Sequence, residues 1–481
     1  MNARPLWRGA LMTGLACVSG VSFAEQRLET FDTDPGWDGH NNRPPEQSAR
    51  TVTQDFGYSA SGGPDLGQGA IGGTISPDGA PAYYAKEIPI ITLQDSFSAS
   101  GALAVKEGTG NTLLGFFNSH TLNEWRTPNT IAFRINGRGE FFHVHIEYAT
   151  NKWRAGASVI GRHDRAADRV YPLEISSGGV HRWSLAYDPS GKNGGGSIVA
   201  AFDDQRAVCN LEPGHKLDGA SFDRFGLLNV VKHADSPGEL WIGPVAINGT
   251  PENLETEPDW KGFQNRRTYV SEDVRPCFNF GYSPTRYAGG TSAGEMGGLF
   301  FRGDCRYPAR LAYYGARLEP LTLERSLRAS GKLTLRRGVT DSSTLFGYFH
   351  ATHSVWVNPA QSDLLPMNFL GMCIEGPSSE GFFVYPCYRL HGDEQSHGRD
   401  NNPPRIYPDG TALRWTLEYD PAGAGGDGAI TVGLGDQTVT LKLQPGHKSA
   451  GCEFNRFGLI TPWIDGNGQM VYFDDIEYTC R

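Results

Sequence analysis

The chain carries the same sequence twice, and this duplication constrains its fold more than any other feature. Three motifs recur at a constant separation of 232 positions: WSLAYDP at 183–189 with WTLEYDP at 415–421, GHK at 214–216 and 446–448, and FDRFGL at 222–227 with FNRFGL at 454–459. Solenoid repeats are far shorter than this, so the pattern indicates two copies of a whole domain.

The two copies are predicted to span 25–250 and 259–481. Similar motifs open them, WDGHNNR at 37–43 and WKGFQNR at 260–266. The segment between the copies, 251–258, has the sequence PENLETEP, which is polar and bounded by proline, as expected of a linker.

The first 24 residues have the pattern of a secretory signal peptide. Arg4 and Arg8 precede an apolar run, and SFA at 22–24 offers a small-x-small cleavage site. Cys17 raises the alternative of a lipoprotein, but the residues before it match such a site poorly. No later stretch reaches the roughly 18 apolar residues that a membrane span needs. We therefore expect an exported protein, secreted or periplasmic, with no membrane span.

The charge balance argues against nucleic acid as a partner. The chain has 43 basic and 53 acidic residues and a net charge of −10 at pH 7, with no basic run. Nucleic-acid binding depends on clustered Lys and Arg that neutralise phosphates. An acidic chain also lacks a global field that would attract an anionic polymer, although a local basic cleft is compatible with this balance.

Cysteine usage differs between the copies. Of the 8 cysteines, all but Cys17 follow the signal sequence, and the second copy holds most of them: Cys277, Cys305, Cys373, Cys387, Cys452 and Cys480. An even set in an exported domain predicts disulfides, whose connectivity the sequence leaves open. Zinc is the alternative, but no close C-x-x-C pair supports it. Cys209, alone in the first copy, is expected to be a buried thiol.

Composition and periodicity both indicate an all-β protein. The chain has 62 Gly and 30 Pro, which suit many turns, and helical periodicity is nearly absent. Short alternating stretches such as IVAAF at 198–202 and ITVGL at 430–434 are typical of strands between tight turns. About a dozen strands in each copy suit a two-sheet jelly roll. We predict two tandem antiparallel β-sandwich domains.

Each copy closes with a long strand-like segment, GELWIGPVAI at 238–247 and QMVYFDDIEY at 469–478. In this ending and in the order of its strands, the chain resembles the concanavalin A-like lectin/glucanase superfamily, which includes laminin-G-like modules and many polysaccharide hydrolases and lyases. It also resembles a family of exported bacterial proteins built from such a tandem pair. The resemblance implies jelly-roll domains that bind or process glycans, but a fold alone does not define a reaction.

The first copy contains a strand with three polar side chains on one face. In EFFHVHIEY at 140–148, apolar residues alternate with His143, His145 and Glu147. The preceding strand, 130–136, ends in an Asn-Gly hairpin signal, and the strand before it spans 113–120. If these strands form a meander, one sheet face carries a polar set: Asn118, His120, Arg134, Asn136, His143, His145 and Glu147.

Four further side chains from neighbouring loops are expected to contact a substrate. They form two Trp-Arg pairs, one in the loop above this face and one just after the strand: Trp125, Arg126, Trp153 and Arg154. Tryptophan supplies a flat apolar surface for a sugar ring, and arginine supplies a forked donor for hydroxyls or carboxylates.

Two catalytic interpretations fit these residues, and both use the same set: His143, His145, Glu147 and Arg134. In a polysaccharide lyase, a histidine abstracts the proton α to a uronate carboxylate, which Arg134 or Arg126 and an asparagine neutralise. The motifs of jelly-roll alginate lyases are not reproduced, however. In a glycoside hydrolase, two carboxylates flank the scissile bond, and Glu147 has no evident carboxylate partner on its own strand.

Three other interpretations of this strand stay open. Its residues can contact sugar without catalysis. The His-x-His-x-Glu spacing is also compatible with zinc, because residues two apart on a strand point the same way. Polar residues on the solvent face of an antiparallel sheet are also common without any function.

The second copy lacks this polar set. Aligning FF at 141–142 with FF at 382–383 places three residues opposite the polar positions: Val384, Pro386 and Tyr388. Three side chains there become candidates for substrate binding: Tyr385, Tyr388 and Arg389. Three interpretations follow: a catalytic first copy with a ligand-binding second copy, two lectin-like copies with different ligands, or drift on a solvent face.

We therefore predict an exported carbohydrate-active protein that acts on an extracellular polysaccharide, as a lyase or hydrolase with its site on the first copy. The alternative is a non-catalytic, lectin-like tandem module, and a role in surface assembly comes third. No cofactor is expected. The turn DGNG at 465–468 is compatible with a structural calcium, although a plain turn explains it more simply.

Overall fold

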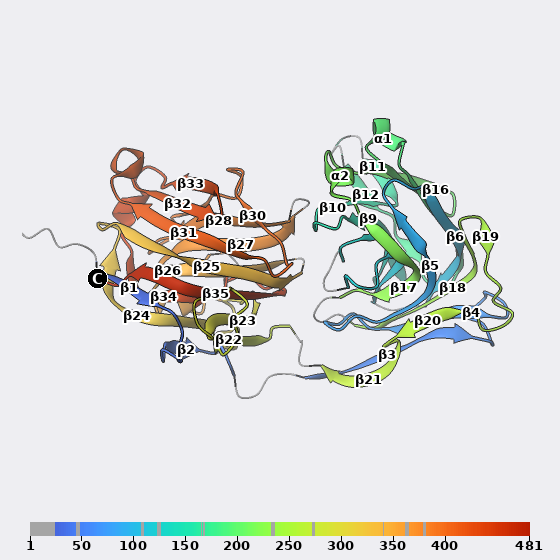
Figure 1. Ribbon diagram of the computed structural model, residues 1–481, viewed down its shortest axis with the longest axis horizontal. Coiled ribbons are helices and arrows are strands. Elements are labelled where there is room, and N and C mark those ends of the chain that lie inside the picture. The colour runs from blue at the N-terminus through green and yellow to red at the C-terminus, as the bar shows by residue number, and fades with distance from the viewer. Residues whose placement is uncertain are drawn as a thin grey trace, which may run out of the picture.

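The computed structural model describes residues 25–44, 49–106, 110–122, 127–164, 166, 169–231, 236–271, 275–339, 341–360, 365–378 and 381–481. Its main sheets are antiparallel and form two β-sandwiches that lie side by side (Figure 1). This confirms the predicted fold class of two tandem antiparallel β-sandwich domains.

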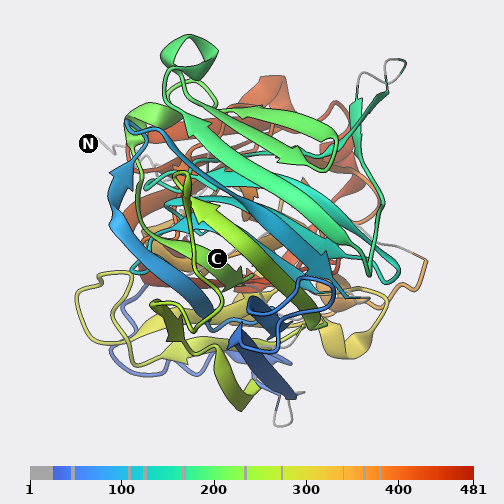
Figure 2. The ribbon, with the colours of Figure 1, turned by 90° about the vertical axis from the view of Figure 1, so that its right-hand side faces the viewer.

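The first sandwich has an outer and an inner sheet. The outer sheet has the order β16 (Gln205–Asn210), β15 (Ser197–Phe202), β14 (Val180–Asp188), β6 (Phe97–Val105), β18 (Gly238–Ile247), β4 (Ala70–Ile75), β3 (Arg50–Ser59) and β21 (Arg266–Ser271), with β19 (Thr250–Pro251) beside β18. Figure 2 shows this sheet in front, with the second sandwich behind it.

The inner sheet of the first sandwich has the order β10 (Ala155–Val159), β9 (Phe141–Ala149), β8 (Thr130–Gly137), β7 (Asn111–Phe117), β17 (Ser221–Asn229), β5 (Tyr83–Thr92) and β20 (Trp260–Phe263), with β13 (Ile175–Ser176) beside β9. Smaller elements complete this sandwich: the hairpin of β11 (Gly161–Asp164) and β12 (Arg169–Pro172), and the single-turn helices α1 (Gly191–Gly194) and α2 (His215–Asp218).

The second sandwich repeats this plan. One sheet has the order β22 (Phe278–Ser283), β23 (Glu295–Phe301), β35 (Gly468–Thr479), β25 (Leu327–Gly338), β31 (Ala412–Asp420), β32 (Ala429–Leu434) and β33 (Gln437–Lys442), with β1 (Gln26–Glu29) beside β35. The other has the order β2 (Asp38–His40), β24 (Tyr313–Thr322), β34 (Glu453–Ile460), β26 (Ser342–Phe349), β27 (Phe369–Ser378), β28 (Gly381–Arg389) and β29 (Gln395–His397), with β30 (Arg405–Ile406) beside β28.

Short 3₁₀ turns are the helical elements of the second sandwich: η1 (Pro308–Arg310), η2 (His353–Val355), η3 (Gly423–Gly426) and η4 (His447–Ala450). No helix in the described part of the chain is long and apolar enough to cross a membrane.

Alternation along the strands explains how each core forms. On β9, Phe142, Val144 and Ile146 are fully buried between the two sheets of the first sandwich, whereas His143 and His145 lie on the opposite face. Successive side chains of a strand point to opposite faces, so one strand contributes both to the core and to a polar surface.

The opening segment of each copy lies in the sandwich of the other copy. Figure 1 shows the blue strands β1 and β2 in the orange-red sandwich, and the yellow-green strands β20 and β21 in the blue-green sandwich. β2 pairs with β24 so that Gly39 is opposite Tyr314, and β20 pairs with β5 so that Gly262 is opposite Tyr84. The two registers match, so the exchange is reciprocal.

Each exchanged segment buries a tryptophan in the sandwich that it joins. Trp37 and Trp260 are 8% and 5% exposed. The Trp37 ring centre lies 5.8 Å from that of Tyr314, and the Trp260 ring centre lies 5.9 Å from that of Tyr84, with the same interplanar angle of 30°. Buried aromatic side chains contribute strongly to core stability, so each core depends on a tryptophan from the other copy.

An asparagine then fixes each exchanged segment to the neighbouring strand. Asn42 Nδ2 donates to the carbonyl oxygen of Phe280 at 2.6 Å. Asn265 Nδ2 makes the equivalent bond to the carbonyl oxygen of Phe56 at 2.5 Å. These side-chain bonds extend the strand pairing past the end of β2 and β20.

The exchange differs from the predicted domain ranges, 25–250 and 259–481. Strand pairing places residues 26–40 in the second sandwich and residues 260–271 in the first. Similarity between the copies shows that two segments are equivalent. It does not show which copy each segment packs against.

The expected linker, 251–258, is a fixed part of the first sandwich. The Glu252 carboxylate accepts hydrogen bonds from Lys86 Nζ at 2.7 Å and from Trp260 Nε1 at 3.2 Å. Leu254 is buried in the core of the first sandwich. The segment therefore seats Trp260 against the first sandwich instead of separating two free domains.

The described cysteines form no disulfide with one another, so the predicted disulfides are absent from this structure. Cys373 and Cys387 belong to one buried apolar cluster of the second sandwich, and Cys277 and Cys452 belong to another. Burial raises the pKa of the Cys373 and Cys387 thiols well above the usual value. These cysteines pack as small apolar side chains, a use that an even count cannot distinguish from cross-linking.

The exchange predicts that Trp260→Ala unfolds the first sandwich locally, although Trp260 belongs to the second copy by sequence. The cavity left by the missing indole should lower the unfolding free energy by about 3–5 kcal/mol. Hydrogen exchange should show lost amide protection in β5 and β17, with β24 and β34 unchanged. Trp37→Ala is the matched control and should show the reverse. Loss of protection in β24 and β34 of the Trp260 variant would contradict the exchange.

Candidate functional site

The predicted meander lies on the inner sheet of the first sandwich. β7, β8 and β9 are neighbours, and their register places Asn136 opposite His143 and Arg134 opposite His145. Six polar residues of these strands lie on the face turned away from the core, and we call them the polar strip: Asn111, Arg134, Asn136, His143, His145 and Glu147.

A buried ion pair anchors the polar strip. Arg134 Nε donates to Glu147 Oε1 at 2.8 Å, and the two side chains are 11% and 7% exposed. Arg134 Nη1 also donates to Asn111 Oδ1 at 3.4 Å. Because an unpaired buried charge is strongly destabilising, the pair fixes the guanidinium and compensates its charge. Glu147 is therefore committed to Arg134 instead of being presented to a ligand.

The two histidines of the polar strip are partly buried and neutral at neutral pH. Burial, followed by the charge of Arg134, lowers the pKa of His145 from 6.5 to about 4. Burial also lowers the pKa of His143, and the charge of Arg138 is the second cause. A neutral imidazole offers one N–H donor and one acceptor nitrogen, so each ring can both donate to and accept from a ligand.

The apolar part of the same sheet face is covered. Leu113, Phe117 and Leu228 form a buried cluster there with Val339, which belongs to the second sandwich. Figure 1 shows β9 and β10 on the side of the first sandwich that faces the second. The polar strip therefore lies beside the contact between the two sandwiches.

Asn118 and His120 lie outside the polar strip, because β7 ends at Phe117 and not at the predicted position 120. Asn118 Nδ2 donates to the carbonyl oxygen of Ser221 at 3.2 Å and so fixes a turn. His120 is exposed, and its Nε2 lies 3.9 Å from Asp223 Oδ2.

The Trp-Arg pairs also lie apart from the polar strip where the structure describes them. Trp153 adopts a φ of 58° in the turn between β9 and β10. Arg154 Nη1 pairs with Asp218 Oδ1 at 3.2 Å, which ties this turn to α2. Trp125 and Arg126 lie outside the described residues.

The second copy matches the polar strip with a shift of one residue from the predicted alignment. Tyr388 Oη lies 2.9 Å from His447 Nδ1, and Tyr148 Oη lies 3.0 Å from His215 Nδ1, so the two tyrosines are equivalent. The residues equivalent to His143, His145 and Glu147 are therefore these three: Phe383, Tyr385 and Cys387. A one-residue slip reverses every side chain of a strand, so the predicted alignment compared core residues with the strip.

The three predicted binding residues of the second copy stabilise that sandwich instead. Tyr385, Tyr388 and Arg389 are each 0% exposed. Tyr385 Oη donates to Glu375 Oε2 at 2.6 Å, and the Arg389 guanidinium lies 5.0 Å from the ring centre of Trp463. Burial removes these side chains from contact with a ligand.

The sequence prediction omitted Asn111 from the polar strip. The expected strand began at Leu113, whereas β7 begins at Asn111. The signal was weak, because NTLLGFF at 111–117 is a polar pair followed by an apolar run and shows no alternation. Extending the strand two residues back from Leu113 places Asn111 on the same face.

No group of three His, Cys, Asp or Glu side chains within the described ranges is placed to hold a metal ion. Glu147, the third residue of the His-x-His-x-Glu pattern, is bonded to Arg134. Asp465 of the predicted calcium turn pairs with Arg275 Nη2 at 2.8 Å. Both carboxylates thus have an arginine as partner.

No protein-family model matches the chain, and no curated protein matches it. Three matching solved structures are concanavalin A-like β-sandwiches. Domains LG4–5 of the mouse laminin alpha1 chain are 10% identical, with 89% of this chain and 90% of that chain covered and a TM-score of 0.24. An alginate lyase from Alteromonas is 9% identical, with 46% and 92% covered and a TM-score of 0.23. The Emp47p carbohydrate recognition domain is 8% identical, with 42% and 88% covered and a TM-score of 0.27.

The lowered pKa of His145 predicts that acid destabilises the first sandwich. An unfolded histidine titrates near 6.5 and the folded one near 4, so on acidification the unfolded chain takes up the proton first. The unfolding free energy should therefore fall between pH 6.5 and about 4. Urea unfolding across this range should show a smaller fall in His145→Asn than in the wild type. His163→Asn, on the exposed strand β11, is the matched control. If the unfolding free energy depended on pH equally in all three proteins, the acid destabilisation could not be attributed to His145.

Proposed function

We propose that the polar strip binds a sugar chain without cleaving it. The observation that carries this proposal is a charge-compensated arginine beside two neutral histidines on one sheet face. Sugar hydroxyls both donate and accept hydrogen bonds, and neutral imidazoles and the Asn136 amide match that chemistry. Phe141 is partly exposed with its ring centre 5.4 Å from that of His143, so it adds an apolar surface for a sugar ring.

The same geometry argues against hydrolysis at the polar strip. A glycoside hydrolase needs a carboxylic acid and a second carboxylate on either side of the scissile bond. Glu147 is nearly buried, and its carboxylate accepts the Arg134 Nε hydrogen bond. The polar strip holds no second carboxylate that could act together with Glu147.

A lyase reaction also lacks one of its requirements at the polar strip. β-Elimination from a uronate needs a cation that neutralises the substrate carboxylate, together with a base that takes the adjacent proton. His145 is neutral and can accept a proton, although its pKa of about 4 makes it a weak base, and the charge of Arg134 is already balanced by Glu147. Binding accounts for the arrangement without a further cation.

The proposed ligand is an extracellular polysaccharide. The signal-like pattern of the first 24 residues motivates the proposal that the protein is exported, secreted or periplasmic, where such polymers are available. The net charge of −10 favours a ligand that is not strongly anionic, because like charges repel at long range.

Binding to a polysaccharide panel tests the proposal, with absorbance at 235 nm and reducing ends followed in the same samples. We expect one polymer to bind without either product signal, and His143→Ala/His145→Ala to weaken binding about tenfold or more. His120→Ala, which removes an exposed histidine outside the polar strip, should bind as the wild type does. Absorbance at 235 nm that disappears in the double variant would establish a lyase instead. Reducing ends alone would establish a hydrolase.

A further inference from the structure

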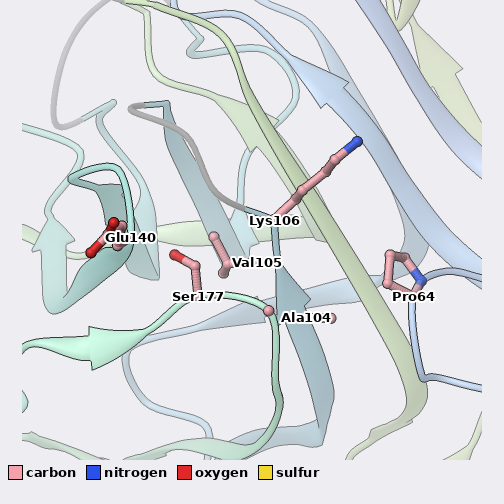
Figure 3. A pocket seen from close by; sticks show the side chains of 7 residues that line it. Pro64, Ala104, Val105, Lys106, Glu140 and Ser177 are labelled. Atoms are coloured by element: carbon pink, nitrogen blue, oxygen red, sulfur yellow. The ribbon is translucent and has the colours of Figure 1, made fainter.

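The outer sheet of the first sandwich carries two adjoining cavities beside the loop between β3 and β4, residues 60–69. The first has a volume of about 330 Å³, and Figure 3 shows its lining: Pro64, Ala104, Val105, Lys106, Glu140 and Ser177. The second has a volume of about 540 Å³ and is lined by nearby residues of the same loop and strands, including Leu66, Ala102 and Arg182. Cavities of this size are typical of small-ligand sites.

The second sandwich closes the space that corresponds to the first cavity. Arg336 occupies the place of Lys106, and its guanidinium lies 4.1 Å from the ring centre of Tyr287. That ring centre in turn lies 4.9 Å from the ring centre of Tyr472. Lys106 instead turns away to Glu239, with Nζ 2.9 Å from the carboxylate, and this leaves the first cavity open.

The second cavity also has a closed counterpart. Lys332 occupies the place of Ala102, and its Nζ donates to the carbonyl oxygen of Gly289 and to Asp475 Oδ2, both at 2.8 Å. These contacts hold the loop of the second copy down on its sheet. The first copy has Ala102 and Pro244 in place of Lys332 and Asp475, and neither side chain can bridge sheet and loop.

The rim of the two cavities has no excess of positive charge, because Lys106 is paired with Glu239. Two acidic and two basic side chains border them, with two hydroxyls between: Asp65, Glu140, Lys106, Arg182, Ser100 and Ser177. The floors are formed by small apolar groups, which pack against the C–H faces of a sugar ring. This rim offers donors and acceptors for hydroxyls but no positive field for a polyanion.

We infer that the two cavities form one groove that binds a neutral oligosaccharide, with one sugar ring in each cavity. Tyr287 shows in the second copy that a six-membered ring packs against this part of the sheet. The groove lies on the outer sheet, whereas the polar strip lies on the inner sheet. The inference therefore does not depend on the function proposed for the polar strip.

Calorimetric titration with neutral oligosaccharides of glucose, xylose and mannose tests the groove. Ala102→Lys gives the first copy the lysine that closes the second, and we expect it to weaken binding of the bound probe about tenfold or more. Ala201→Lys places the same charge on the same sheet face two strands away, on β15, and should bind as the wild type does. The unfolding midpoint of each variant checks that it is folded.

Two further variants separate the cavities and the two sites. Glu140→Gln, at the exposed rim, should weaken binding at the first cavity without disturbing the core. His143→Ala/His145→Ala removes part of the polar strip and shows whether a probe binds there instead of in the groove. Equal affinities of the wild type and Ala102→Lys, or no binding of any neutral probe by folded protein, would overturn the groove. Loss of binding in the histidine variant alone would assign the sugar to the polar strip and also overturn it.

Discussion

The rest of the structure depends on the reciprocal exchange of the two opening segments. Trp37 closes the core of the second sandwich and Trp260 closes the core of the first, so neither core is complete without residues of the other copy. Domains joined by a single linker usually move relative to one another. Here two crossing segments and the cluster around Val339 connect the sandwiches, which keeps the polar strip beside the second copy.

The duplication lets each copy serve as a comparison for the other. The inner and the outer sheet of the first copy each carry a polar or open surface, and side chains fill the equivalent surfaces of the second copy. Phe383, Tyr385 and Cys387 stand where the first copy has the polar strip, and Lys332 and Asp475 bridge the space where the first copy has a groove. The shared backbone explains the fold of both copies, while these differences concentrate the candidate binding surfaces on the first.

The alternation of apolar and polar residues was enough to predict the sandwich fold and to place His143, His145 and Arg134 on adjacent strands. The exchange was beyond this reasoning, because the opening segments fit either copy equally well by sequence. The face of Tyr385 was also missed, since a one-residue shift changes the face but hardly changes the similarity. The cysteines show the same limit: their number suggested cross-links, but only packing shows that they fill apolar clusters.

The exchange also bears on how such a chain can diversify. Two separate single-copy chains with this opening segment would complete one another as a symmetric, strand-exchanged dimer, in which the same surface patch appears on both subunits. A mutation in such a dimer changes both patches together. Once the two copies are joined in one chain, each can be altered alone while the exchange still holds them together. In the tandem chain the two copies no longer need to be identical. One copy can therefore keep a ligand-binding surface while the other closes the equivalent surface.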